Sequence, residues 1–291
     1  MFGKLLLWYA RSGWGRALRR SAFRKFCRAR RGATHISQTT AGVTMETVLG
    51  DSVDNAIFVL GEFEPTTTNL FRRLAPHVHG LVDVGCNIGY FTCLFGRLRP
   101  DLSILAVDAN PQMIARTRRN LDLNGIRNAS LLSKGLAAET GNMTLHVPRD
   151  RHSLASFAYQ PGSEKAAAID TIDVEVTTLS RAIQDFAPPR GLFVKIDTEG
   201  FEHAVLSGLD LDDVERVDAL LIEANHRNLA RAGLDLSRLL SFAWLAEFCW
   251  FEVDDQRGRF EAVTPEAMKS RTDINTNLLF LRAALATKLA R

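Results

Sequence analysis

Short apolar segments alternate with longer segments of helical spacing along most of the chain. Residues 81–85 predict the first buried strand, and Phe91, Leu94, Phe95 and Leu98 recur after it at the spacing of a helix. The same alternation continues, with strands predicted at 104–108, 129–133, 192–197 and 219–223 and with helices over 111–124 and 198–209.

This alternation predicts an α/β fold, in which a mostly parallel sheet is covered by helices on both faces. Two late segments, 250–253 and 277–281, predict an antiparallel strand pair that closes the sheet. Ahead of the alternation, residues 42–63 predict short strands and turns, and 66–74 predict a helix that leads into the core. The chain therefore has one large domain with a small lead-in.

One internal segment departs from the pattern. Residues 141–176 are less regular, and we expect a hairpin-like strand at 143–147 and a mobile segment around 149–165.

The positive charge of the chain is concentrated at its N-terminus. The formal net charge is +3, but residues 1–31 contain ten Lys or Arg and no acid, which leaves 26 basic and 33 acidic residues elsewhere. We therefore expect no nucleic-acid partner for the body of the protein. The first thirty residues fit an amphipathic helix on an anionic membrane surface, an organelle-targeting segment, or a helix packed on the domain.

The cysteines indicate a reducing compartment. Cys27, Cys86, Cys93 and Cys249 form neither a Cys-x-x-Cys pair nor a zinc-like cluster. No apolar run reaches the length of a membrane span. We expect a cytoplasmic protein, with peripheral contact to the inner face of a membrane through residues 1–31 as an alternative.

A glycine-containing loop follows the first strand. Gly85 and Gly89 allow a tight turn and close approach of a ligand, and Asn87 between them tolerates left-handed geometry. The loop starts with Asp83, which disfavours a pyrophosphate but suits a cationic ligand. Asp108 ends the second strand, where a carboxylate can accept both hydroxyls of a ribose.

The alternative is that both acids only cap their own loops. We favour the ligand interpretation, because both lie at carboxyl ends of strands, where such sheets bind ligands.

A second group of polar residues lies around the fourth strand. Lys195 is charged within an apolar strand, and Asp197 ends it. Glu199 and His203 would share one face of the next helix. We predict an acceptor site with Asp197, Glu199 or His226 as general base, while a structural ion pair from Lys195 to Glu199 or Glu223 is the alternative. Asp197, Glu199 and Glu223 have the ligand chemistry of a divalent cation, but we assign no metal.

The order and spacing of these motifs resemble the FkbM family of methyltransferases over roughly residues 61–281. The matching segments are 63–65 (FEP), 83–92 (DVGCNIGYFT), 108–111 (DANP), 120–125 (NLDLNG) and 195–200 (KIDTEG). The family usually has Glu-Pro in place of Asp108-Ala109, and often alanine in place of Gly135 beside the expected adenine pocket.

The resemblance implies a Rossmann-like class I methyltransferase fold with a seven-stranded sheet, S-adenosylmethionine as methyl donor, and a hydroxyl acceptor on a sugar or natural product. Residues 42–291 would form the methyltransferase domain, with 42–80 as its lead-in, and 1–41 a basic extension. His152 and Ser153 would help to cover the acceptor. The predicted donor site comprises Asp83, Gly85, Asn87, Gly89, Asp108, Asn110 and Ser133.

Two other classes remain open from the sequence. An NAD-dependent oxidoreductase has a similar sheet, although the missing middle glycine and Asp83 disfavour it. A non-catalytic Rossmann-like module acting at a membrane would have no need of Asp83, Asp108 and Asp197.

Overall fold

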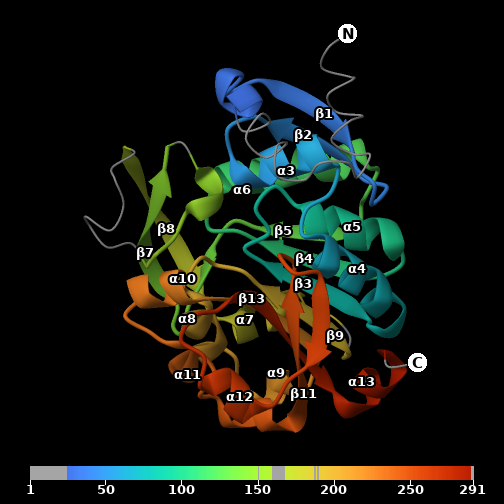
Figure 1. Cartoon of the computed structure of the whole chain (residues 1–291), viewed down its shortest axis with the longest axis vertical. Helices are drawn as coiled ribbons and strands as arrows, with labels where there is room; N and C mark the ends of the chain where they lie inside the picture. Colours follow the sequence, from blue (N-terminus) through green and yellow to red (C-terminus); the bar gives the residue numbers. More distant parts are fainter. Residues whose placement is uncertain (1–24, 150, 159–167, 187, 189, 290–291) are drawn as a thin grey trace.

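An eight-stranded sheet runs through the protein in the order β12-β11-β13-β10-β9-β3-β4-β5 (Figure 1). The computed structural model describes residues 25–149, 151–158, 168–186, 188 and 190–289. The strands of this sheet are β3 (Gly80–Val84), β4 (Ser103–Val107), β5 (Ala129–Leu132), β9 (Leu192–Ile196), β10 (Val217–Asn225), β11 (Phe248–Asp254), β12 (Arg259–Ala262) and β13 (Asn275–Arg282).

The centre of this sheet is parallel, as the alternation predicts. β5, β4, β3, β9 and β10 pair in parallel, whereas β13 is antiparallel to β10 and to β11. The seven expected strands are all present and in a Rossmann-like order. An additional strand, β12, pairs with β11 at the edge.

Helices cover both faces of the sheet, because successive side chains of each strand point to opposite faces. Val82 and Val84 of β3 belong to a buried apolar cluster with α7 (Leu179–Phe186), α8 (Glu202–Ser207), α9 (Leu211–Val214), α10 (His226–Arg231), α11 (Leu236–Leu239) and α12 (Pro265–Lys269). Leu81 belongs to a second cluster with α3 (Ser52–Leu60), α4 (Pro65–Leu74), α5 (Tyr90–Leu98), α6 (Pro111–Leu123) and α13 (Ala283–Leu289).

The lead-in differs from its prediction. β2 (Thr44–Val48) is the expected strand, but 52–60 form helix α3 instead of turns. Asp51 starts this helix by accepting a hydrogen bond from the N–H of Val53, and Gly61 ends it in a left-handed conformation. β2 pairs with β1 (Thr34–Gln38), so the boundary expected at residue 42 falls within a hairpin.

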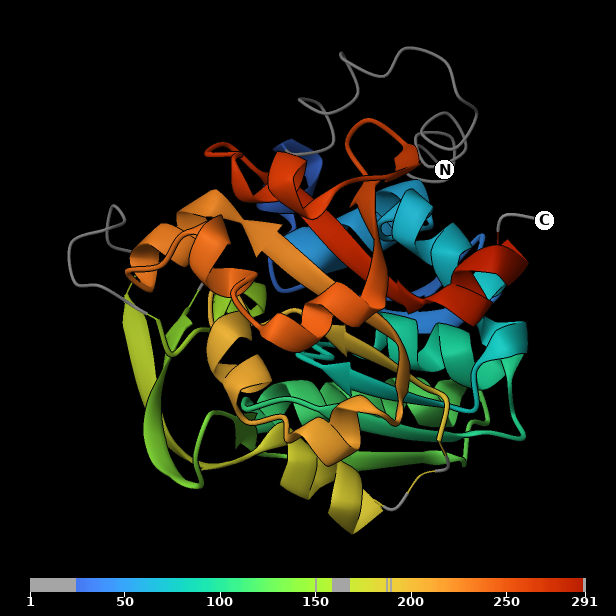
Figure 2. The same cartoon turned by 90° about the horizontal axis from the view of Figure 1, so that it is seen from below.

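A smaller sheet has the order β6-β8-β7 and lies on the opposite side of the molecule from α13 (Figures 1 and 2). Its strands are β6 (Gly135–Leu136), β7 (Gly141–Pro148) and β8 (Ile169–Thr177), so the predicted hairpin-like strand is present. Of the mobile segment expected around 149–165, residues 149 and 151–158 are described and include a short 3₁₀ turn, His152–Leu154. The rest of that segment, and residues 1–24 of the basic segment predicted over the first thirty residues, lie outside the described residues. None of the helices in the described parts has the length and apolarity to cross a bilayer.

Candidate active site

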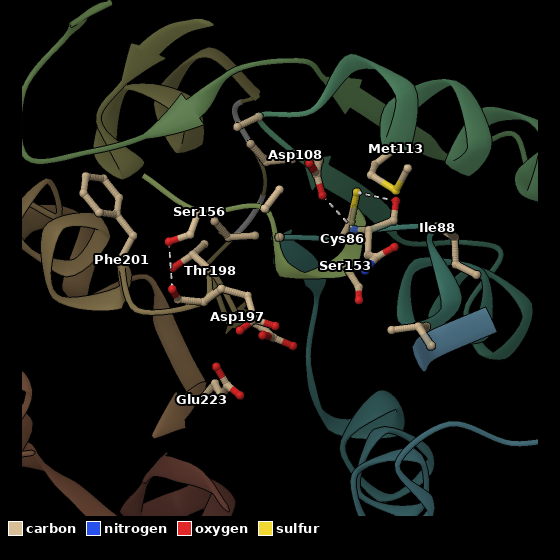
Figure 3. A pocket seen from close by; sticks show the side chains of 18 of the residues that line it. Cys86, Ile88, Asp108, Met113, Ser153, Ser156, Asp197, Thr198, Phe201 and Glu223 are labelled. Atoms are coloured by element: carbon tan, nitrogen blue, oxygen red, sulfur yellow. Dashed lines mark hydrogen bonds between the residues drawn. The ribbon is translucent and has the colours of Figure 1, made fainter. Parts of the chain in front are cut away.

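A deep pocket opens at the carboxyl ends of β3, β4, β9 and β10. It contains about 1150 Å³ of empty space, part of it open to solvent. Polar residues that line it include Glu64, Asn87, Asp108, Lys134, His152, Ser153, Lys195, Asp197, Glu199 and Glu223. Of these, Asp108, Ser153, Asp197 and Glu223 are labelled in Figure 3.

The β3–α5 loop bends sharply around the pocket. Gly85, Asn87 and Gly89 have φ values of 75°, 52° and 78°, so each residue is left-handed. A Cβ atom on Gly89 would lie 2.6 Å from Cγ2 of Thr117, which leaves room there only for glycine. Gly85 and Asn87 line the pocket, whereas Gly89 lies behind it, against α6.

Asp108 follows β4 and lines the same pocket. Its carboxylate accepts hydrogen bonds from the backbone N–H groups of Asn87, at 2.9 Å, and Asn110, at 2.8 Å. Burial raises the pKa of Asp108 to about 7, against the effect of these two hydrogen bonds. Each carboxylate oxygen keeps a second lone pair for a ligand hydroxyl.

Asp83 does not line the pocket. Alternation along β3 places its side chain on the face of Leu81, beneath α5, where it is 1% exposed and accepts a 2.6 Å hydrogen bond from Oγ1 of Thr92. Lys195 is its neighbour in register on β9. Burial raises the pKa of Asp83, while Lys195 lowers it. Any effect of Asp83 on a ligand is therefore indirect, through Lys195.

Lys195 and Asp197 form an ion pair at the end of β9. Nζ of Lys195 lies 2.9 Å from Oδ2 of Asp197 and 5.2 Å from the ring centre of Phe91. Burial opposes the charge of Lys195, but Asp197, Asp83 and Glu64 outweigh it and raise the pKa of the lysine. The expected partners Glu199 and Glu223 are not the ones that pair with it.

Glu199 and Glu223 share an amide partner at the pocket wall. Nδ2 of Asn228 donates to Oε2 of Glu199 at 2.8 Å and to Oε2 of Glu223 at 3.1 Å. Burial and the charge of Asp197 raise the pKa of Glu199 to about 8 and raise that of Glu223 well above its usual value. Within the described ranges, no cluster of three or more His, Cys, Asp or Glu has the arrangement of a metal site.

The predicted helix after β9 begins later than expected. Glu199 is left-handed, with a φ of 54°, and helical structure starts only at Glu202. The carboxylate of Glu202 accepts hydrogen bonds from the N–H groups of Thr198 and Gly200, which holds the intervening turn. Glu199 and His203 therefore do not share a helix face.

Three other predicted residues lie outside the pocket lining. Nδ1 of His226 lies 3.0 Å from the carbonyl oxygen of Ile274 and 3.2 Å from Oδ1 of Asp273, so its position does not support a role as base. Asn110 caps α6 by accepting a hydrogen bond from the N–H of Gln112. Ser133 is exposed, and the next three residues, 134–136, line the pocket in its place.

Sequence reasoning missed two parts of the site. Glu64 lines the pocket, and the Glu64-Pro65 pair at a predicted helix start was its available signal. Phe157 is the other: a Cβ atom on Gly135 would lie 2.7 Å from its ring. No local sequence pattern predicts this contact between Gly135 and Phe157.

The strand order and the pocket at the strand ends define a Rossmann-like class I methyltransferase fold. A model described as the Methyltransferase FkbM domain matches residues 83–253, more than half of the chain. The chain therefore belongs to the FkbM methyltransferase family.

Relatives with assigned names are similar over part of their length. Methyltransferase sdnD of Sordaria araneosa is 29% identical over 168 residues, which cover 49% of this chain and 65% of that protein. Methyltransferase 1 of Beauveria bassiana (strain ARSEF 2860) is 27% identical over 157 residues, covering 49% and 63%. The match thus spans less than two thirds of either relative. A solved structure of an rRNA methylase from Streptococcus thermophilus is 12% identical, with a TM-score of 0.40. The match covers 76% of this chain and 98% of that one.

Proposed function

We propose that the protein transfers a methyl group from S-adenosylmethionine to a hydroxyl of a sugar or a natural-product-like small molecule. The position of Asp108 is the observation that carries the proposal. Its carboxylate is held by two backbone N–H groups, faces the pocket and keeps one free lone pair on each oxygen. This arrangement suits the two neighbouring hydroxyls of a ribose.

The rest of the pocket has the chemistry that such a donor requires. The lining includes the apolar residues Met113, Leu136, Leu145 and Phe157, which suit an adenine ring. The lining also includes the carboxyl groups of Glu64, Asp197, Glu199 and Glu223, which suit a ligand with a sulfonium and an ammonium group. The residues present therefore fit S-adenosylmethionine, with Gly85 and Asn87 beside Asp108 at its middle.

S-adenosylmethionine, when bound, supplies a methyl group activated by the positive charge of the sulfonium. This chain would contribute mainly by holding the acceptor oxygen in line with that methyl group, since alignment supplies a large share of the acceleration in such displacements. Asp197, Glu199 and Glu64 line the pocket and are the candidates to take the proton of the acceptor. His152 and Ser153 line the pocket as well and would help to exclude water.

Isothermal titration calorimetry tests the donor. We expect S-adenosylhomocysteine to bind at micromolar concentrations and NAD not to bind. Binding of NAD alone would overturn the proposal in favour of an oxidoreductase. For the acceptor, we expect that cells lacking the protein accumulate a metabolite lighter by one methylene unit than a metabolite of normal cells.

We further propose that the protein acts in the cytoplasm. Cys27, Cys86 and Cys93 are buried free thiols, as is usual in a reducing compartment. Co-sedimentation of the full chain with anionic liposomes, compared with a chain lacking residues 1–31, tests whether the basic N-terminus also contacts a membrane. Equal sedimentation of the two chains would exclude this contact.

A further inference from the structure

The side chain of Glu64 lines the pocket and does not cap the helix that follows it. It precedes α4 in a left-handed conformation, with a φ of 43°, and its side chain does not cap the helix. Asp255 caps α4 instead, since its Oδ1 accepts hydrogen bonds from the N–H groups of Thr66, at 2.6 Å, and Thr67, at 3.3 Å. The carboxyl group of Glu64 is thus available to the pocket.

A small network positions this carboxyl group. Nδ2 of Asn277 on β13 donates to Oγ1 of Thr67 at 3.1 Å and, more weakly, to Oε2 of Glu64 at 3.4 Å. Thr67 in turn donates through its hydroxyl to Asp255. Three segments far apart in the sequence therefore hold Glu64 in place.

The charges around Glu64 are unbalanced. The charged groups that act on it are Lys195, Asp197 and Asp255. Lys195 is itself faced by three carboxyl groups, those of Asp197, Asp83 and Glu64. One buried cation does not neutralise three anions, so one of the carboxyl groups favours a proton. Burial and Asp197 raise the pKa of Glu64 to about 8.

We propose that Glu64 holds a proton in the free protein, releases it when the positively charged methyl donor binds, and then accepts the proton of the acceptor hydroxyl. This inference rests on the proposed function. The strand order supports it: Asp108 follows β4, Gly85 follows β3 and Asp197 follows β9, next to Glu64. A donor with its ribose at Asp108 therefore extends its charged end toward Glu64.

Glu64 loses one proton and regains one proton in each reaction. A positive charge within about 4–6 Å lowers the pKa of a carboxyl group by roughly 1–3 units, so the proton of Glu64 leaves to solvent on binding. During transfer, the acceptor O–H bond breaks, its proton passes to Glu64, and the oxygen forms a bond to the methyl carbon. The electron pair of the broken C–S bond stays on sulfur. The product thioether is neutral, so Glu64 is again in its protonated state.

Calorimetry in two buffers of different ionisation enthalpy, phosphate and Tris, measures this proton release with the full chain. At pH 7, we expect Glu64 of the wild-type protein to release most of one proton per S-adenosylmethionine bound, because the charge of the donor lowers the pKa of this group from about 8. Glu64→Gln should lose this release. S-adenosylhomocysteine lacks the sulfonium charge, so it should cause only the proton release that comes from ionisation of Asp108, which both ligands share and which Glu64→Gln should leave unchanged.

The matched control is Glu62→Gln, the same change two residues earlier. Glu62 lies 3.7 Å from Arg72 and does not line the pocket, so this variant should keep the wild-type release. Equal release by the wild type and Glu64→Gln, or by the two ligands, would overturn the inference. Failure of the wild type to bind either ligand would overturn the proposed function, and the inference with it.

A second variant covers the case in which Glu64→Gln does not fold, as judged by circular dichroism and S-adenosylhomocysteine binding. Asn277→Ala removes a hydrogen bond that lowers the pKa of Glu64. The pH of maximal proton release should therefore move upward. An unchanged maximum would contradict the role of Glu64.

Discussion

The backbone carbonyl oxygen of Asp197 lies only 1.8 Å from the point where a Cβ atom of residue 85 would be. Gly85 belongs to the loop after β3, and Asp197 follows β9, so this contact joins the two motifs of the site. The N–H of Asp197 also donates a 3.0 Å hydrogen bond to the carbonyl oxygen of Val84. The pocket therefore depends on a close backbone approach that only glycine permits.

Gly85→Ala should disrupt both stability and binding. The overlap with Asp197 adds to the cost of a left-handed alanine, and we expect the free energy of unfolding to fall by about 2–4 kcal/mol. Urea denaturation measures this. Gly125→Ala is the matched control, because Gly125 is also left-handed, with a φ of 66°, but has no neighbour within 4 Å of a Cβ atom. It should lose only about 1 kcal/mol, and equal losses would contradict the argument.

Asp108→Asn should weaken binding of S-adenosylhomocysteine about 10- to 100-fold. The amide presents an NH₂ group to the N–H of Asn87 or Asn110 and loses charge-assisted hydrogen bonds to the ribose. Calorimetry measures the affinity. Asp122→Asn, an exposed site on α6, should bind like the wild type. Unchanged affinity of Asp108→Asn would remove Asp108 from the donor site.

Binding of S-adenosylhomocysteine should also depend on pH through Asp108. Because burial raises its pKa to about 7, the carboxylate is mostly ionised at pH 8 and mostly protonated at pH 6. Ribose hydroxyls donate better to the ionised form, so the affinity should fall about tenfold from pH 8 to pH 6. The Asp108→Asn variant should lack this tenfold fall in affinity. An identical pH profile of binding in the two proteins would show that Asp108 is not its cause.

Gly135→Ala should destabilise this protein. Its Cβ atom would lie 2.7 Å from the ring of Phe157, and we expect a loss of about 1–3 kcal/mol in urea unfolding. In a double-mutant cycle, Phe157→Leu should recover more than about 0.5 kcal/mol of that loss. Strictly additive effects would show that the ring is not the cause.

Arg116→Ala should lower the free energy of unfolding by removing an ion pair between α6 and α3. Arg116 pairs with Asp54 of α3, which is 1% exposed. The variant leaves this buried carboxylate without its cation, at a cost of about 3–5 kcal/mol at neutral pH. The control is Arg119→Ala, on the same helix as Arg116. Arg119 is an exposed partner of Glu46, and its loss should cost under about 1 kcal/mol. Similar losses in both variants would contradict this view.

The loss in Arg116→Ala should shrink on acidification. Burial raises the pKa of Asp54 although Arg116 lowers it, so removal of the arginine raises it further. Between the unfolded and folded pKa values, the folded state then binds more protons, and stability increases as the pH falls. Urea unfolding at pH 5 should therefore show a smaller difference from the wild type than at pH 7. A difference independent of pH would exclude an ionised Asp54 as the cause.

The strands and the glycine loop could be predicted from the sequence because their signals are local. Buried parallel strands need short apolar runs, and a tight turn beneath a ligand needs glycine or asparagine, as at Gly85 and Asn87. Asp108 was predictable for the same reason, since it directly follows such a strand.

Which side chains meet in the pocket was decided only by the tertiary structure. Asp83 lies in the predicted motif, but the alternation of side chains along β3 turns it away from the pocket. Glu64 and Asn277 are 213 residues apart, and their contact depends on β13 lying beside β10. Direction across a sheet and contact between distant segments follow from packing, which no local pattern encodes.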